Sequence, residues 1–206
     1  MAFVSGLVLA GGEGKRVGAF KPALLLGGRP LIARPVEVLH QLSDEVLVAH
    51  GPGRHAERLA GLVQGARLVG DEGLGPLGGL QGGARHARGE WLLVAPCDAP
   101  FLSVALYQAL LRRGQESDGC ILRTSGRDNL IIAAYRRGAL RRASERALGD
   151  GERAVRAILS HLRVARLTEE DLTGIPYGLH SIFDIDTPED LARAEDLLRL
   201  GPDPSP

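Results

Sequence analysis

The sequence predicts an α/β fold, a three-layer sandwich in which a mostly parallel sheet carries helices on both faces. The first observation is that short apolar runs alternate with segments whose apolar residues recur at helical spacing. The second is that the runs in the first half are almost continuously apolar, which is typical of strands buried on both faces. The third is the length of 206 residues, which allows a sizeable core without disulfides or structural metals.

Strands and helices are expected to alternate through the first half of the chain. Its apolar runs predict strands over residues 3–9, 45–49, 66–69 and 91–95. The segments between them predict helices over 30–42, with an interruption at Pro35, and over 54–63, 77–87 and 103–113.

The pattern changes in the second half. Strands are predicted over 119–122, 130–135 and 163–167, and helices over 138–148 and 152–159. Residues 182–185 lead into a last helix over 188–200, for which Thr187 is the expected N-cap and Asp190 its capping-box partner. The tail GPDPSP, residues 201–206, predicts a helix stop followed by disorder.

Composition excludes several classes of protein. The formal net charge is +0 and aromatic residues are 4%, which argues against a broad nucleic-acid-binding surface. No apolar run approaches the roughly 18 residues of a membrane span. The apolar start lacks a positive n-region and reads as a core strand, and Cys97 and Cys120 read as buried thiols in a reducing compartment. We predict a cytoplasmic protein that binds neither nucleic acid nor membrane.

A glycine-rich loop with clustered cations follows the first predicted strand. The chain has 25 lysine and arginine residues, and both of its lysines, Lys15 and Lys21, lie in the stretch GGEGKRVGAFKPALL together with Arg16. Gly11 and Gly12 let the backbone approach a ligand closely, and the cations can bind phosphates. Neither the GxxxxGK[ST] phosphate loop nor the GxGxxG dinucleotide fingerprint matches here. A structural turn without a ligand is the alternative.

A second loop places a carboxylate at the end of the strand over 91–95. Asp98 stands in the run PCDAPF, whose prolines stiffen the loop. Parallel strands present their carboxyl ends at one ligand-binding edge, and Mg²⁺ commonly takes one or two carboxylates plus substrate phosphates. Asp98 is therefore a candidate magnesium ligand, and the alternative is a helix cap for the segment that begins near Ser103.

Two further acidic positions are candidates. Asp71, in the glycine-rich stretch GDEGLGPLGGLQGG, can accept hydrogen bonds from a base or ribose, or can simply belong to a turn. Asp186, in FDIDTPEDL, can join Asp98 at the metal, and Asp184 can share that role. The competing interpretation of Asp186 is a contribution to the cap of the last helix.

The combination of these segments resembles the MobA family, the molybdenum cofactor guanylyltransferases among the glycosyltransferase-A-like nucleotidyltransferases. LAGGEGKRVG resembles the family's LAGGxxxRMG signature, and FKPALLLGGRPLI resembles its DKxLxxLxGxPLI continuation. GPLGGL, PCDAPFL and FDIDTPEDL follow in the family's order. The departures are Phe20 for the usual Asp, Val17 for Met and Asp186 for Asn, and DIDTPEDL also occurs in relatives that transfer cytidylyl groups.

The resemblance implies a Rossmann-like sheet of the nucleotide-diphospho-sugar transferase type. It implies a single nucleotidyltransferase domain over residues 1–200, with a nucleotide-binding half over about 1–115 and an acceptor-binding half over about 116–200. It implies GTP bound by Leu9, Ala10, Gly11, Gly12, Lys21 and Asp71, with His50 near the base or ribose and Asp98 holding Mg²⁺.

The reaction that the resemblance implies is transfer of GMP from GTP to Mo-molybdopterin with release of pyrophosphate. Arg16 and Lys21 are expected to stabilise charge on the triphosphate and Asp98 to hold Mg²⁺. Candidates to bind the acceptor's phosphate are Arg123, Arg127, Asn129 and Arg153. Partners can include proteins of molybdenum-cofactor biosynthesis or acceptor proteins. The alternatives are a cytidylyl- or other nucleotidylyltransferase and a non-catalytic nucleotide sensor or adaptor.

Overall fold

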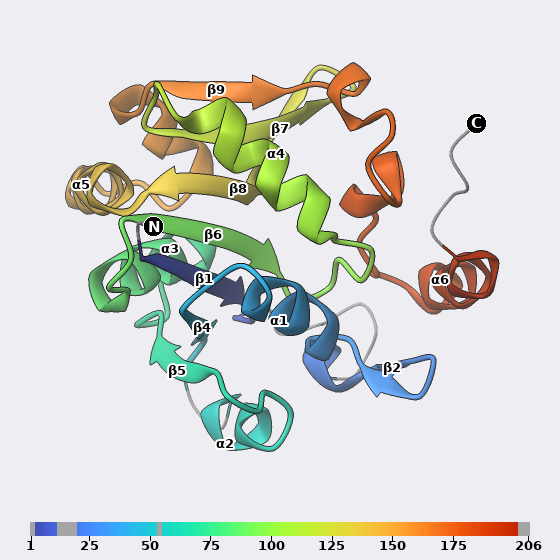
Figure 1. The fold of residues 1–206 in the computed structure, drawn as a ribbon. Coiled ribbons are helices and arrows are strands. Elements are labelled where there is room, and N and C mark those ends of the chain that lie inside the picture. The colour runs from blue at the N-terminus through green and yellow to red at the C-terminus, as the bar shows by residue number, and fades with distance from the viewer. Residues whose placement is uncertain (1–2, 12–19, 53–54, 202–206) are drawn as a thin grey trace.

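The computed structural model describes residues 3–11, 20–52 and 55–201. Gly12, Lys15 and Arg16 and the tail beyond Gly201 lie outside these ranges, so the predictions made for them are not tested. Within the described residues, the main sheet has seven strands in the order β5-β4-β1-β6-β8-β7-β9 (Figure 1).

The sheet is parallel in its first half and mixed beyond. Parallel pairs join β1 to β4, β1 to β6, β4 to β5 and β7 to β9, whereas β8 runs antiparallel to both β6 and β7. The mostly parallel sheet is thus confirmed. The strands span Val4–Leu9 (β1), Glu45–His50 (β4), Arg67–Gly70 (β5), Trp91–Pro96 (β6), Gly119–Thr124 (β7), Arg127–Arg136 (β8) and Val164–Leu167 (β9).

Helices cover both faces of this sheet, as the three-layer prediction requires. One core cluster joins the sheet to α1 (Ala33–His40), α2 (His55–Ala60) and α4 (Val104–Gly114). A second cluster on the other face joins it to α3 (Gly75–His86), α5 (Arg137–Gly149) and the 3-10 segment η2 (Val155–His161). In Figure 1, α1 and α4 lie in front of the sheet and α3 lies behind it.

Helix α3 packs closely on the sheet because glycines face it. A Cβ atom added to Gly83 would lie 2.3 Å from Leu7 Cδ2, and one added to Gly79 would lie 3.0 Å from Leu9 Cδ2. The glycine-rich composition of this helix therefore serves backbone approach. The close packing brings the first turn of α3 to the carboxyl edge of β1.

Two local predictions differ from the structure, and one element was not predicted. Pro35 does not interrupt a helix, because α1 begins at Ala33 and Pro35 falls in its first turn, where no backbone donor is required. The predicted helix over 152–159 is a 3-10 segment. The residues around 25–30 form an unpredicted hairpin of β2 (Leu25–Leu26) and β3 (Arg29–Pro30), whose turn uses Gly27 and Gly28 at φ 58° and 75°.

The last helix, α6 (Pro188–Leu200), packs on this hairpin rather than on the sheet. A separate apolar cluster joins Leu26 and Leu31 to Phe101, Ile185 and Ala194. Thr187 Oγ1 accepts from the N–H of Asp190 and the Asp190 carboxylate accepts from the N–H of Thr187, so the predicted capping box is confirmed. Two short 3-10 segments, η3 (Glu170–Leu172) and η4 (Gly178–Ile182), lead from β9 towards this region.

No helix in the described ranges combines the length and apolar composition needed to cross a lipid bilayer. Cys97 and Cys120 are both buried and unpaired, as predicted.

Candidate active site

The site begins where four parallel strands end at one edge of the sheet. Leu9, the last residue of β1, stands opposite Pro96 of β6, and the N–H of Cys97 donates to the carbonyl of Leu9 at 3.1 Å. On the other side, the N–H of Ala10 donates to Ala49 at 2.8 Å, and that of Asp71 donates to His50 at 3.0 Å. This ladder brings the residues directly after β1, β5 and β6 to one edge.

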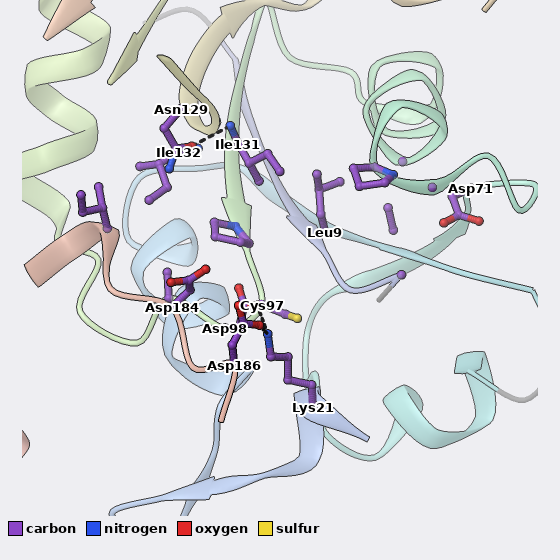
Figure 2. A pocket seen from close by; sticks show the side chains of 18 residues that line it. Leu9, Lys21, Asp71, Cys97, Asp98, Asn129, Ile131, Ile132, Asp184 and Asp186 are labelled. Atoms are coloured by element: carbon purple, nitrogen blue, oxygen red, sulfur yellow. Dashed lines mark hydrogen bonds and ion pairs between the residues drawn. The ribbon is translucent and has the colours of Figure 1, made fainter. Parts of the chain in front are cut away.

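Lys21, Asp98 and Asp186 converge at this edge. The Lys21 ammonium lies 2.6 Å from Asp98 Oδ2 and 2.6 Å from Asp186 Oδ1 (Figure 2). Lys21 opens the 3-10 segment η1 (Lys21–Ala23), and its preceding residue, Phe20, is buried in the core with the Arg58 guanidinium 3.9 Å above its ring. Packing of the Phe20 side chain thus anchors the residue directly before the lysine.

A backbone hydrogen bond brings Asp186 to this position. The N–H of Ile185 donates to the carbonyl of Asp98 at 3.2 Å, which ties two segments that are far apart in the sequence. Ile185 is fully buried, and Thr187 begins helix α6 directly after Asp186. The caps proposed as alternatives use other residues, since Thr187 caps α6 and Ser103 Oγ caps α4. The carboxylates of Asp98 and Asp186 both bond to Lys21.

The charges at this cluster compensate one another. Burial alone would lower the pKa of Lys21, but hydrogen bonds and charges from Asp186 and Asp98 outweigh burial and raise that pKa above its usual value. The lysine is therefore a cation at neutral pH. Burial, together with the negative charges of Asp186 and Asp98, raises the pKa of the Asp184 carboxyl. Burial also raises the pKa of the Cys97 thiol, which is consistent with a packing role.

A cavity of about 480 Å³ connects this cluster to both halves of the chain. In Figure 2, Asp71 lies on one side of it, Asn129, Ile132 and Asp184 lie on the other, and Lys21, Asp98 and Asp186 lie together at its base. It is lined by Leu9, Gly11, Lys21, Ala49, Asp71, Gly75, Pro76, Gly79, Pro96, Cys97, Asp98, Ala99, Asn129, Ile131, Ile132, Ile182, Asp184 and Asp186.

Asp71 is held rigidly beside Gly11, two residues after the end of β1. Only 4% of its surface is exposed, and its Oδ1 accepts from the N–H of Gly73 at 2.8 Å, which is the turn geometry considered as an alternative. That bond leaves Oδ2 facing Gly11, where an added Cβ would lie 2.6 Å away. Asp71 thus combines a turn role with a position on the cavity wall.

Replacing Gly11 with alanine is therefore expected to displace the Asp71 carboxylate. We expect Gly11→Ala to lower the free energy of unfolding by about 1–3 kcal/mol through overpacking and to weaken stabilisation by added nucleotide. Thermal unfolding with and without GTP measures both effects. The control is Gly70→Ala, because a Cβ at Gly70 meets nothing within 4 Å. Equal behaviour of the two variants would contradict the close contact with Asp71.

Several predicted residues lie elsewhere or are not described. Ala10 is fully buried and is not part of the cavity lining. His50 is also absent from the lining, and its Nδ1 lies 2.7 Å from the carbonyl of Gly51. Of the four residues predicted to bind the acceptor's phosphate, the cavity lining includes Asn129 and not Arg123, Arg127 or Arg153. The guanidinium of Arg123 bonds instead to Asp128. Gly12 and Arg16 fall outside the described residues.

Two features of the cavity lining were not predicted: the side chains of three isoleucines and the start of helix α3 at Gly75. Ile131, Ile132 and Ile182 line the cavity, whereas nothing in the sequence distinguishes them from core residues. The first turn of α3, Gly75 and Pro76, was placed outside the predicted helix. Pro76 could have predicted that the helix starts before residue 77, because proline is favoured in the first turn of a helix.

The donor set at the base of the cavity suits Mg²⁺. Asp98 and Asp186 present carboxylate oxygens to one shared cation, the Lys21 ammonium. Among the described residues, no three His, Cys, Asp or Glu side chains are arranged to hold a metal. Two carboxylates supplemented by phosphate oxygens are nevertheless the ligands that Mg²⁺ commonly takes in nucleotide-dependent enzymes.

Comparison with known proteins identifies the family. The MobA-like NTP transferase domain matches residues 6–167. This chain belongs to the MobA-like NTP transferase family. The MobA-like fold and the predicted class of enzyme, a nucleotidyltransferase, are thereby confirmed.

Individual relatives of this MobA-like chain extend over nearly its whole length. A molybdenum cofactor guanylyltransferase of Rhodobacter capsulatus is 34% identical over 200 residues, which cover 95% of this chain and 97% of the relative. The crystal structure of molybdopterin-guanine dinucleotide biosynthesis protein A from Archaeoglobus fulgidus superposes with a TM-score of 0.82 at 28% identity, covering 95% and 99%. A 2-C-methyl-D-erythritol 4-phosphate cytidylyltransferase from Thermus thermophilus, at 24% identity and a TM-score of 0.71 with 94% and 98% covered, shares the fold.

Proposed function

We propose that this enzyme transfers GMP from GTP to Mo-molybdopterin, forming the guanine dinucleotide cofactor and pyrophosphate. The proposed reaction type rests on one observation: the Lys21 ammonium lies 2.6 Å from both Asp98 and Asp186 at the base of the cavity. The choice of GTP and Mo-molybdopterin is supported by relatives named molybdenum cofactor guanylyltransferase that are 34% identical over most of the chain.

The chemistry requires positioning and charge neutralisation. An oxygen of the acceptor's terminal phosphate attacks the α-phosphorus of GTP, a new P–O bond forms, and the bond to the β-phosphate breaks as pyrophosphate leaves with its electron pair. The acceptor phosphate is already anionic, so no strong general base is needed. The catalytic contribution of the chain is then alignment of the reactants and stabilisation of the charge that shifts to pyrophosphate.

Each part of the cavity has a task in this proposal. The Asp71 side, with the start of α3, receives the guanosine, and Asp71 accepts hydrogen bonds from the base or ribose. Lys21, with Arg16 from the glycine-rich loop, stabilises the triphosphate. The side with Asn129, Ile132 and Asp184 receives the acceptor.

Asp98 and Asp186 are proposed to hold Mg²⁺. When bound there, Mg²⁺ supplies positive charge that neutralises the phosphate oxygens and aligns them for in-line displacement. The two carboxylates, which also bind Lys21, would be the chain's ligands to the ion. We propose that the enzyme acts in the cytoplasm, where proteins of molybdenum-cofactor biosynthesis would supply its acceptor.

A nucleotide panel tests base and reaction together. We expect GTP with Mg²⁺ to raise the midpoint of thermal unfolding more than CTP, ATP or UTP, because a ligand stabilises the native state by mass action. We also expect pyrophosphate release with GTP when Mo-molybdopterin is added. Preferential stabilisation and turnover with CTP would favour the cytidylyltransferase alternative. Binding of GTP without pyrophosphate release in the presence of Mo-molybdopterin would favour a nucleotide sensor.

A further inference from the structure

Strand β8 carries a bulge of three residues at the wall of the cavity. Ile121 of β7 pairs with Ala133, but the next residue, Leu122, pairs with Asn129, so residues 130–132 have no partners on β7. On its other side, β8 pairs with β6 up to Ala133 opposite Val94 and not beyond. The bulge therefore turns β8 away from the end of β6, beside the cavity.

Two side chains satisfy the backbone of this bulge. Asn129 Oδ1 accepts from the N–H groups of Ile131 and Ile132, both at 3.0 Å, and the Tyr135 hydroxyl donates to the carbonyl of Leu130 at 2.8 Å. Tyr135 is fully buried, so that support is rigid. Bulges next to active sites commonly re-aim a side chain, and this one fixes Asn129 and two isoleucines at the cavity.

The double acceptor role of Oδ1 determines which way the Asn129 amide faces. With Oδ1 bound to two backbone donors, the Nδ2 group has two hydrogens and no hydrogen-bond partner among the described residues. Asn129 is half-buried, and its Nδ2 is not among the fully buried side-chain atoms of those residues that lack a hydrogen-bond partner. Asn129 thus offers an oriented donor from a cavity-lining position.

The surroundings of this donor are mostly apolar. Ile131, Ile132 and Ile182 line the same cavity as Asn129, and Asp184 adds a carboxyl group. Figure 2 places Asn129 and Ile132 across the cavity from Asp71. A site with apolar walls and few fixed polar groups orients a flat ligand through those polar groups.

We infer that Asn129 binds the acceptor, donating through Nδ2 to an oxygen of a phosphorylated heterocyclic compound. The inference rests on the proposed function, because it assigns the acceptor to the side of the cavity opposite Asp71. The isoleucines then provide the apolar surface for the heterocycle, and the bulge fixes the donor before the ligand arrives. Such preorganisation lowers the entropic cost of binding.

Three substitutions at this position separate the donor from the structural role of the side chain. Asn129→Asp and Asn129→Ser keep an oxygen that can accept from the bulge N–H groups, but both lose the Nδ2 donor. Asn129→Ala also loses the side-chain oxygen that accepts from the bulge N–H groups. The aspartate adds a negative charge, whereas the serine is neutral. If both variants bind the acceptor more weakly, charge repulsion is excluded as the cause.

Equilibrium binding of Mo-molybdopterin, measured by ultrafiltration without nucleotide, is the decisive readout. We expect Asn129→Asp and Asn129→Ser to weaken binding roughly tenfold or more, because a ligand oxygen loses its partner. Their thermal midpoints and their stabilisation by GTP should stay near those of the unmodified protein. Asn129→Ala should lose both acceptor binding and thermal stability.

Other outcomes would overturn the inference about Asn129, the proposed function, or both. Wild-type binding by both the aspartate and serine variants, with loss in the alanine variant alone, would reduce Asn129 to a support of the bulge. Loss in the aspartate variant alone would be charge repulsion and would also overturn the inference. Wild-type protein that binds Mo-molybdopterin but releases no pyrophosphate with GTP overturns the proposed function while the binding series still decides Asn129. Absence of any binding by the wild-type protein overturns both.

Discussion

Asp98→Asn is expected to reduce kcat/KM for pyrophosphate release by about a thousandfold or more. The amide has nearly the same size as the carboxylate but lacks its charge, so it is a poor ligand for Mg²⁺ and a weak partner for the Lys21 ammonium. The backbone carbonyl of Asp98, which accepts from Ile185, is unchanged by the substitution. Asp186 also still bonds to Lys21, so the fold should persist.

Steady-state pyrophosphate release at several Mg²⁺ concentrations measures this effect, and circular dichroism checks the fold. The matched control is Asp196→Asn, which neutralises one partner of an exposed ion pair on α6, where the side chains of Arg199 and Asp196 are 74% and 72% exposed. An exposed pair contributes little, so the control should retain nearly full activity. Full activity of Asp98→Asn at limiting Mg²⁺ would contradict the assignment of Asp98 as a metal ligand.

The convergence of Lys21 and Asp98 was predictable because it follows from strand order. An apolar strand that ends at Leu9 and another that ends near Pro96 bring their loops together once they are parallel neighbours, and the register pairs these two residues. The position of Asp186 was predictable only as a possibility. It depends on a hydrogen bond from Ile185 to Asp98 and on an apolar cluster around Ile185. No local pattern reports such contacts.

The side of the cavity that holds Asn129 was less predictable for a related reason. Residues 130–135 predict an uninterrupted strand, since Leu-Ile-Ile-Ala-Ala-Tyr is a short apolar run that includes β-branched and aromatic residues. The bulge becomes visible only in the pairing with β7, where Leu122 meets Asn129. An asparagine before an apolar run does not by itself predict a bulge. Asn129 Oδ1 can accept from the N–H groups of Ile131 and Ile132 only in the backbone conformation that these residues adopt. The division of the domain near residue 115 stays a prediction, although the cavity takes residues from both sides of it.

Lys21→Met is expected to lower kcat by about two to three orders of magnitude, with a smaller effect on the KM for GTP. Methionine keeps the length and apolar stem of the side chain but removes the charge. The lysine side chain is only 11% exposed, so its ammonium acts in surroundings where charge is poorly screened. The substitution also removes the cation that Asp98 and Asp186 share.

Separate measurement of kcat and KM decides what Lys21 contributes. A lysine that stabilises the charge developing on pyrophosphate acts mainly in the transition state, so its loss lowers kcat. A lysine that only holds the ground-state triphosphate would leave kcat intact and raise KM, and that result would make it a binding group. Arg199→Met, the other half of the exposed pair on α6, is the charge-matched control. Lys21→Arg completes the series, because a planar guanidinium restores the charge but is too large for a position 2.6 Å from two carboxylates, so kcat should recover only in part.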